Sequence, residues 1–157
     1  MYKQLVNGLV IGSVGVLFAS AALALEPCNE VVVDNANILS TNDENRIATA
    51  AAELAALGVT VRVRTSLDHG SFSSLQVAAD TVCANLWGGD RMVYWVATDT
   101  RDVGMYTGLA WEGKITPSIQ SQIIDNEMMP ALRNSSFATA FIQAILKTKN
   151  ICVQYQR

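Results

Sequence analysis

Three carboxylates in this sequence could bind a metal ion. Asp34 ends a run of valines, Asp90 precedes an apolar stretch, and Glu112 follows the next short strand-like segment. We expect these positions to flank segments that meet at one end of a sheet. Because Ca²⁺ takes carboxylate, amide and carbonyl oxygens from several loops, Asp34, Asp90 and Glu112 are the candidate metal ligands. No EF-hand spacing supports them, so the alternative is that the two aspartates form turns and the glutamate is solvated.

Other reactive side chains give weaker signals. Arg62 and Arg64 project from one face of a predicted strand and could hold an anion, although a solvated strand face is the simpler interpretation. His69 is the single histidine and lies in a Gly- and Ser-rich loop without a second ligand at zinc spacing, which favours a solvated residue. No serine has a nucleophile-elbow context, and no G-x-G-x-x-G or P-loop follows a strand. Catalytic residues stay unknown, and we predict no nucleotide or dinucleotide and no cofactor-binding residue.

The Asp- and Asn-rich stretch VVVDNANILSTNDENRI, residues 31–47, also has a structural explanation. Thr41 and Glu44 have the S/T-x-x-E spacing of a capping box, and Ser40 is the alternative N-cap. The helix that begins there repeats apolar residues at helical spacing and ends at Gly58. Acidic side chains in its first turn are favoured by the helix dipole, so they need no ligand to explain them.

The strands that must position these residues follow from hydrophobic periodicity. Residues 59–65 alternate strictly, with valines on one face and polar side chains on the other. Residues 92–98 are apolar on both faces, which is typical of a central strand covered by helices. The polar turn 99–102 should join this strand to residues 103–107 in a hairpin.

Three further helices are expected: residues 73–85, a segment that starts at Pro117 after the N-cap Thr116 and stops at Pro130, and residues 136–147. The two strands linked by the first of these helices should be parallel, through a right-handed crossover. The order of elements therefore predicts an α/β fold with a small mixed sheet and helices on both faces.

The first residues have the pattern of an export signal. Lys3 is followed by an apolar stretch over residues 9–23 and by an A-x-A ending at Ala22 and Ala24. We predict a signal peptide of residues 1–24 and an exported protein, periplasmic or secreted. The alternative is an uncleaved leader that anchors the protein in a membrane, because the apolar stretch approaches the roughly 20 residues that span a bilayer.

Charge and length limit the partners that the mature protein could have. Without the leader 133 residues remain, enough for one domain, with 10 basic and 14 acidic side chains and no basic block. Nucleic-acid binding depends on Lys and Arg side chains that neutralise phosphates. We therefore expect no nucleic-acid partner.

The chain has three cysteines. Cys83 falls on an apolar helix face and is expected to be buried. Cys28 and Cys152 lie near the two ends of the predicted domain and could form a disulfide in an oxidising compartment. The alternative is that all three thiols are free.

Four segments, taken in order, resemble the TPM-domain family over nearly all of residues 31–148. They are VVVDNANILS, LGVTVRVRTSLDHGSF, VYWVATDTRDVGMYTGL and SQIIDNEMMPALRNSSFATAF. The resemblance implies a small Rossmann-like α/β/α sandwich with a mixed sheet and helices on both faces. It places a TPM-like domain at residues 30–148 and a C-terminal tail at residues 149–157.

Individual residues carry this resemblance. Asp34 matches the family's aspartate before its Leu-Leu-Ser motif, and Arg101 matches the arginine of its hairpin turn. Gly108 and Leu109 match the glycine-leucine pair after the fourth strand. Two departures stand out: a loop shortened to residues 88–91, and arginines at 62 and 64 where the family usually has apolar residues.

The resemblance also suggests a function. The family includes a thylakoid-lumen protein linked to photosystem II repair and an accessory subunit of an acetylcholine receptor. Weak acid-phosphatase activity and calcium binding have been attributed to some members. The resemblance thus implies an exported binding or accessory protein that acts on a partner complex in the cell envelope. The alternative is a weak metal-dependent acid phosphatase, and calcium is the cofactor that the family suggests.

Overall fold

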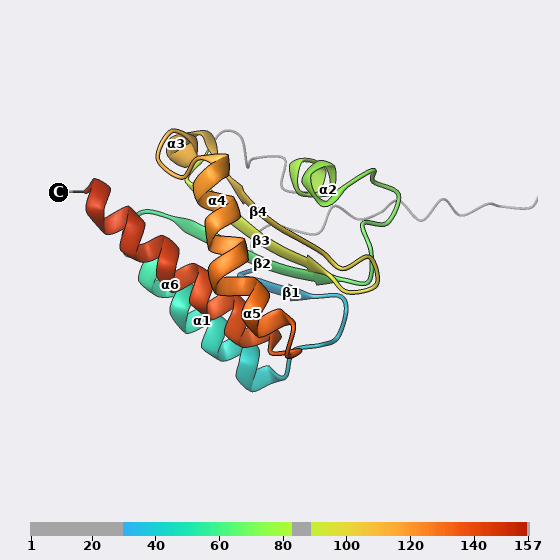
Figure 1. Ribbon diagram of the computed structural model, residues 1–157. Coiled ribbons are helices and arrows are strands. Elements are labelled where there is room, and N and C mark those ends of the chain that lie inside the picture. Colours follow the sequence, from blue (N-terminus) through green and yellow to red (C-terminus); the bar gives the residue numbers. More distant parts are fainter. Residues whose placement is uncertain (1–29, 83–88, 157) are drawn as a thin grey trace, which may run out of the picture.

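A four-stranded sheet runs through the molecule. The computed structural model describes residues 30–82 and 89–156 (Figure 1). The strands lie in the order β1-β2-β3-β4, with β1, β2 and β3 parallel and β4 antiparallel to β3. Their bounds are β1 Val32–Asp34, β2 Thr60–Ser66, β3 Arg91–Ala97 and β4 Asp102–Thr107. The predicted mixed sheet, with its parallel crossover and its hairpin, is confirmed.

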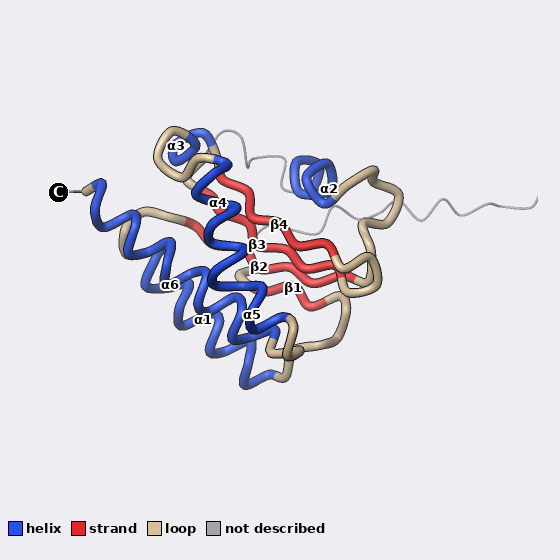
Figure 2. Tube along the Cα trace, in the orientation of Figure 1, coloured by secondary structure: helices blue, strands red, loops and turns tan. Residues whose placement is uncertain are grey.

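Helices cover the two faces of this sheet unequally. Figure 2 separates the strands from the helices that pack on them. Most of the helices lie on one face, whereas α2 packs on the other, against β3 and β4. The predicted α/β fold with helices on both faces is therefore confirmed. The helices are α1 Thr41–Ala55, α2 Leu75–Val82, α3 Leu109–Glu112, α4 Pro117–Ile123, the π-helix η1 Ile124–Met128, α5 Met129–Leu132 and α6 Phe137–Tyr155.

The larger core lies between the sheet and α1 and α6. Val61 and Val63 of β2 face this core, as the alternation in the sequence predicts. At its centre the hydroxyl of Tyr94 donates a hydrogen bond of 2.7 Å to Thr148 Oγ1, which in turn donates to the Ala144 carbonyl at 2.8 Å. Both buried hydroxyls are thus satisfied, which removes most of the cost of burying them.

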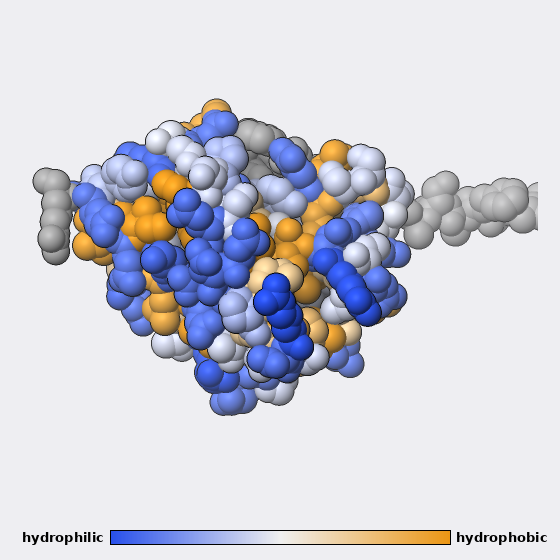
Figure 3. Space-filling view, viewed as in Figure 1, coloured by the Kyte–Doolittle hydropathy of each residue, from blue (hydrophilic) through white to orange (hydrophobic). Residues whose placement is uncertain are grey.

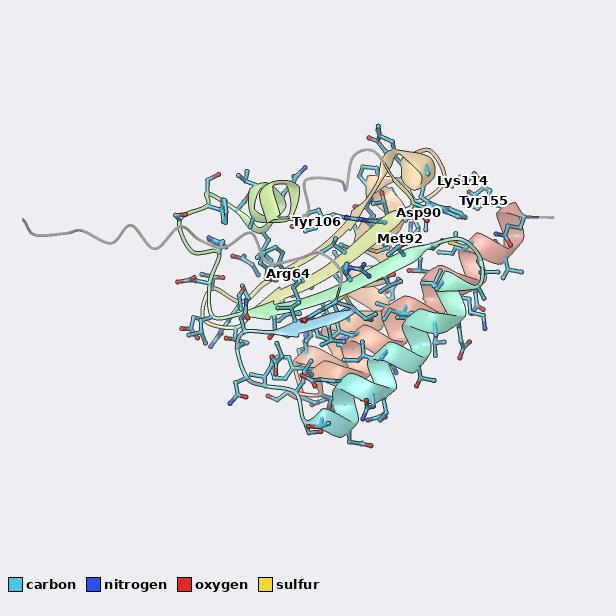
Figure 4. The ribbon with its side chains drawn as sticks, turned by 180° about the vertical axis from the view of Figure 1, so that it is seen from behind. Arg64, Asp90, Met92, Tyr106, Lys114 and Tyr155 are labelled. Carbon is cyan, nitrogen blue, oxygen red and sulfur yellow. The ribbon has the colours of Figure 1, made fainter. Side chains whose placement is uncertain are left out.

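On the opposite face of the sheet, the expectation that the arginines of β2 are solvated is wrong for Arg64. Arg64 is only 4% exposed, and its guanidinium carbon lies 4.9 Å from the centroid of the Trp95 ring. A guanidinium stacks well on an indole, and the aliphatic stem of an arginine covers apolar surface. Arg64 therefore helps to cover the part of the face where the family usually has an apolar residue, and the prediction of a solvated side chain is wrong for it. Figure 4 shows Arg64 on this face of the sheet.

The cap of α1 lies one residue earlier than the predicted Thr41–Glu44 box. Ser40 is the N-cap, and its Oγ accepts a hydrogen bond of 3.2 Å from the Asp43 amide. Asp43 Oδ2 accepts from the Ser40 amide at 3.2 Å and completes the capping box. An aspartate at the third helical position thus does the work usually done by Glu or Gln.

The prediction that Pro130 stops the helix is wrong, because the helical backbone continues past this residue. The π-helix η1 precedes it, and α5 continues beyond it to Leu132. A proline inside a regular α-helix collides with the carbonyl four residues earlier. A π-turn widens the backbone at this point, so the helical path continues past the ring.

The last helix is longer than predicted. α6 runs to Tyr155 rather than ending near Lys147, so most of the predicted tail at 149–157 is helical. The reason is that Ile151 and Cys152 extend its buried face, and Cys152 is fully buried. This final part of α6 packs on the domain instead of forming a separate tail.

Some predictions fall outside the described residues. The leader, Cys28 and Cys83 lie there. Cys152 is a free thiol in this structure. Its pairing with Cys28 stays a prediction, because Cys28 is outside the described residues. Within residues 30–82 and 89–156, no helix has both the length and the apolar composition that crossing a bilayer requires.

Candidate functional site

A pocket of about 520 Å³ lies where the β3–β4 turn faces the turn between α5 and α6. Its volume falls within the roughly 300–1,000 Å³ typical of ligand sites. It also lies at the carboxyl end of β3, and open α/β sheets bind ligands outside the carboxyl ends of their strands. The residues that line it are Val96, Ala97, Thr98, Arg101, Val103, Met129, Leu132, Arg133, Ser135 and Phe137.

The apolar part of the pocket is continuous with the larger core. Val96 is buried in that core, and Val103, Leu132 and Phe137 are partly buried side chains packed against it. Figure 3 shows apolar surface exposed beside strongly hydrophilic side chains, over the region where the β3–β4 hairpin faces α5. Because these side chains are held by the core, the apolar wall is preformed.

Two arginines supply the charge of the pocket. Arg101 comes from the β3–β4 turn and Arg133 from the residue after α5, and both are exposed. In the described part of the chain, neither guanidinium forms an ion pair or a side-chain hydrogen bond. Arginine binds carboxylate and phosphate groups through paired N–H donors. The free donors of Arg101 and Arg133 therefore make this pocket suitable for an anion.

The backbone around the pocket is unusual in two ways. Arg101 and Ser135 adopt left-handed conformations, with φ of 57° and 55°. Such conformations cost a residue other than glycine about 1–3 kcal/mol and gather at functional sites. In addition, η1 leads directly into the pocket residue Met129, and π-turns are frequent at functional sites. Strained backbone conformations and an irregular helix thus both occur at the pocket.

A hydrogen bond from another loop holds the hairpin that carries Arg101. His69 Nε2 lies 2.6 Å from Asp102 Oδ2. This bond, followed by one from Thr100, lowers the pKa of the Asp102 carboxyl below its usual range. The backbone adds a second tie, because the Asp99 amide donates to the Leu67 carbonyl at 2.7 Å. His69 is therefore a tethering residue rather than the freely solvated one that was predicted.

Asp34, the first predicted metal ligand, is occupied by its own loop. One carboxylate oxygen accepts from the Ile38 amide at 3.2 Å, and the other accepts from the Leu39 amide at 2.8 Å. The hydroxyl of Thr65 on β2 donates a further hydrogen bond to this carboxylate. Asp34 thus ends β1 and holds the turn that leads to α1, which is the turn-forming alternative considered above.

The three predicted ligands do not meet. Asp34 pairs with Thr65, and Thr65 pairs with Val96 near the carboxyl end of β3. Asp90 precedes the first residue of that strand, about 20 Å away at some 3.3 Å per residue. Glu112 ends α3, which follows β4. Asp90 and Glu112 therefore share the sheet end opposite to Asp34, and Figure 4 shows Asp90 at that end.

The carboxylates of Asp34, Asp90 and Glu112 are not placed to bind one calcium ion together. Among residues 30–82 and 89–156, no three His, Cys, Asp or Glu side chains are close enough to hold one ion. The expectation that the three positions meet at one end of the sheet is wrong for Asp34. The physical reason is that Asp34 is the last residue of β1 whereas Asp90 precedes the first residue of β3, and parallel pairing places such positions at opposite ends of the strands.

Comparisons with known proteins agree with this architecture. The sequence model of the TPM domain matches residues 32–151. The solved N-terminal domain of a protein from P. gingivalis has a TM-score of 0.70 and 20% identity, over 83% of this chain and 87% of that one. The N-terminal domain of the cg2496 protein from Corynebacterium glutamicum has a TM-score of 0.64 and 19% identity, over 80% of this chain and 81% of that one. At these identities the two structures show a shared fold alone. No curated protein matched the sequence.

Proposed function

The chain belongs to the TPM-domain family, and we propose that it is an exported binding or accessory protein whose Arg101–Arg133 pocket holds an anionic group of a partner in the cell envelope. The observation that carries this proposal is the pair of exposed guanidinium groups, neither of which has an acceptor among residues 30–82 and 89–156, beside a preformed apolar wall. An arginine that lacks an acidic partner in the protein is available to one on a ligand.

The location of the two arginines strengthens the proposal. The whole chain has a net charge of −3, yet the described residues that line this pocket include two positive side chains and no carboxylate. Arg101 keeps a strained backbone conformation, and its hairpin is tethered by His69. Features that restrict the position of a charged side chain favour binding, because less freedom is lost when the ligand arrives.

The alternative function is a weak metal-dependent acid phosphatase, and it has less support. Phosphoester hydrolysis needs an activated nucleophile or water, with a base or a metal ion to activate it. Thr98 and Ser135 line the pocket, but in the part of the chain that the structure describes neither a histidine nor a carboxylate does. The binding role therefore accounts for more of the site than the enzymatic role does.

A comparison of bait proteins tests the binding role. The wild-type chain, the double variant Arg101→Asn/Arg133→Gln and the control Arg46→Gln are each immobilised and exposed to envelope extract of the source organism. Asparagine tolerates the left-handed backbone at position 101, and Arg46 forms only an exposed pair with Asp43, 3.3 Å away. We expect one defined protein to be retained by the wild type and the control and lost by the double variant. Equal retention by all three would contradict the proposal.

The enzymatic alternative is measured with the wild type, the control Arg46→Gln and Asp34→Asn, each shown by its melting curve to be folded. Each is assayed with p-nitrophenyl phosphate at acidic pH, with and without Ca²⁺ or Mg²⁺. Metal-dependent hydrolysis that Asp34→Asn abolishes and Arg46→Gln leaves intact would replace the binding role with the phosphatase.

A further inference from the structure

The pocket has a charged part and an apolar part, and a ligand should match both. On the premise of the proposed function, we propose that the pocket binds the C-terminal carboxylate of a partner polypeptide whose last side chain is apolar. The two arginines would receive the carboxylate, and the apolar wall would receive the side chain.

The charged part suits a carboxylate. Arg101 and Arg133 line the pocket from two different turns. Each guanidinium offers paired N–H donors, which match the two oxygens of a small planar anion. Thr98 and Ser135 line the same pocket. The Thr98 hydroxyl donates to the Ser66 carbonyl at 3.4 Å, so it can only accept from a ligand, whereas Ser135 can bond the last peptide group of the ligand. Carboxylate and amide together form the end of every polypeptide chain.

The apolar part of the pocket indicates a ligand that carries an apolar group as well as an anion. Six of the ten lining residues are apolar, and Val96, Val103, Leu132 and Phe137 form a continuous surface with the core. Inorganic phosphate would leave this surface in contact with water and would gain nothing from it. A side chain such as leucine or phenylalanine would bury it, and this burial is the main source of affinity in apolar pockets.

The open mouth of the pocket favours a polypeptide over a free fatty acid. Figure 3 shows the apolar surface of this region facing solvent. A long acyl tail needs a closed tunnel, because any part outside the protein stays in water. A polypeptide can place its last residue in the pocket and continue into solvent as an ordinary hydrated chain.

Peptide binding to the full chain, produced in an exporting host, tests this proposal. The probe is a fluorescein-labelled hexapeptide, Gly-Ser-Gly-Ser-Gly-Leu, with a free C-terminal carboxylate, and binding is followed by fluorescence anisotropy. The first comparison peptide is identical but ends in an amide, and the second ends in glycine with a free carboxylate. We expect each change to weaken binding about tenfold or more, since one removes the charge and the other removes the apolar side chain.

Variants locate the binding in the pocket. Arg101→Asn and Arg133→Gln should each weaken binding of the leucine acid about tenfold and change binding of the amide little. Arg46→Gln removes the same charge from α1 and should leave every affinity unchanged. Melting curves confirm that each variant is folded, and Arg133→Lys, which keeps the charge, provides a second readout if Arg133→Gln unfolds.

Other results would reject a peptide as the ligand, and they show whether the proposed function fails with it. Displacement by inorganic phosphate, with no difference between acid and amide peptides, would keep an anion site but reject a carboxylate ligand. Displacement by decanoate at lower concentration than the leucine peptide would make a free acid the ligand. If no probe binds in a manner that depends on Arg101 or Arg133, both the ligand and the proposed function fall.

Discussion

His69 Nε2 and Asp102 Oδ2 lie 2.6 Å apart, although 33 positions separate the two residues in the chain. The bond joins the loop before α2 to the first residue of β4. Because Asp102 follows Arg101 directly, this contact also restrains the hairpin that lines the pocket.

The His69–Asp102 bond should make stability depend on pH in one direction. The pKa of Asp102 is lowered in the folded protein, chiefly by its hydrogen bond with His69, whereas the pKa of an unfolded aspartate is about 3.9. A lowered folded pKa contributes stability above the unfolded pKa, and this contribution is lost as pH falls through the folded pKa. The stability advantage of the wild type over Asp102→Asn, measured by urea unfolding, should therefore be full near pH 5–6 and shrink below about pH 4.

A matched control separates this effect from a general loss of charge. Asp125→Asn removes an exposed carboxylate from η1. If the stability difference between Asp125→Asn and the wild type changes with pH in the same way as that of Asp102→Asn, the hydrogen bond with His69 is not the cause of the pH dependence.

Replacing Asp34 should destabilise the fold. Its carboxylate accepts hydrogen bonds from two backbone amides and from the Thr65 hydroxyl. Asp34→Asn keeps the size but loses one acceptor, so at least one half-buried donor loses its partner, at a cost of about 1–3 kcal/mol in the free energy of unfolding. Urea unfolding measures this loss, and Asp34→Ala should cost more.

Calcium distinguishes this structural role from a ligand role. If Asp34 is structural, the loss in Asp34→Asn should be equal with and without millimolar Ca²⁺. A calcium-induced rise in the wild-type Tm that Asp34→Asn abolishes would instead make Asp34 a metal ligand.

Gly104 should not tolerate a side chain. A Cβ added there would collide with the ring of Tyr106, which folds back over this glycine on the α2 face of the sheet. Forcing the ring aside should make Gly104→Ala about 1–3 kcal/mol less stable. In a Tyr106→Ala background the same substitution should cost clearly less, and a double-mutant cycle by urea unfolding measures the coupling. Additive effects would show that the two positions are independent.

The Cys152 thiol should be unreactive in the folded protein. Burial raises its pKa to about 11, against an opposing effect of the Lys114 charge. Since the thiolate is the reactive form, iodoacetamide at pH 8 should label Cys152 only after denaturation. Peptide mass spectrometry measures the labelling. If labelling of the denatured protein also requires a reductant, the predicted pairing with Cys28 gains support.

The mature protein should begin at Leu25. The A-x-A ending at Ala22 and Ala24 sets the predicted cleavage position. Intact-mass measurement of protein from an exporting host checks this expectation. A full-length mass recovered from the membrane fraction would favour the uncleaved anchor.

The sequence by itself determined the local structure and the family of this protein. Alternation in residues 59–65 predicted β2 and the valines that face the core, and the hairpin followed from the turn at residues 99–102. The resemblance to the TPM-domain family also singles out Arg101 in the hairpin turn. These signals can be read from the sequence because periodicity and turn chemistry act over a few neighbouring residues.

Only the tertiary structure decided where the side chains meet. Arg133 and Ser135 come to lie beside Arg101 because η1 and α5 fold back on the sheet, and no local pattern records that approach. Arg64 is buried because Trp95 of the neighbouring strand lies beneath it. The separation of Asp34 from Asp90 follows from parallel pairing and could have been read from the predicted strands. The composition of the pocket could not have been read from the sequence, because contacts between residues far apart in the chain depend on how whole elements pack together.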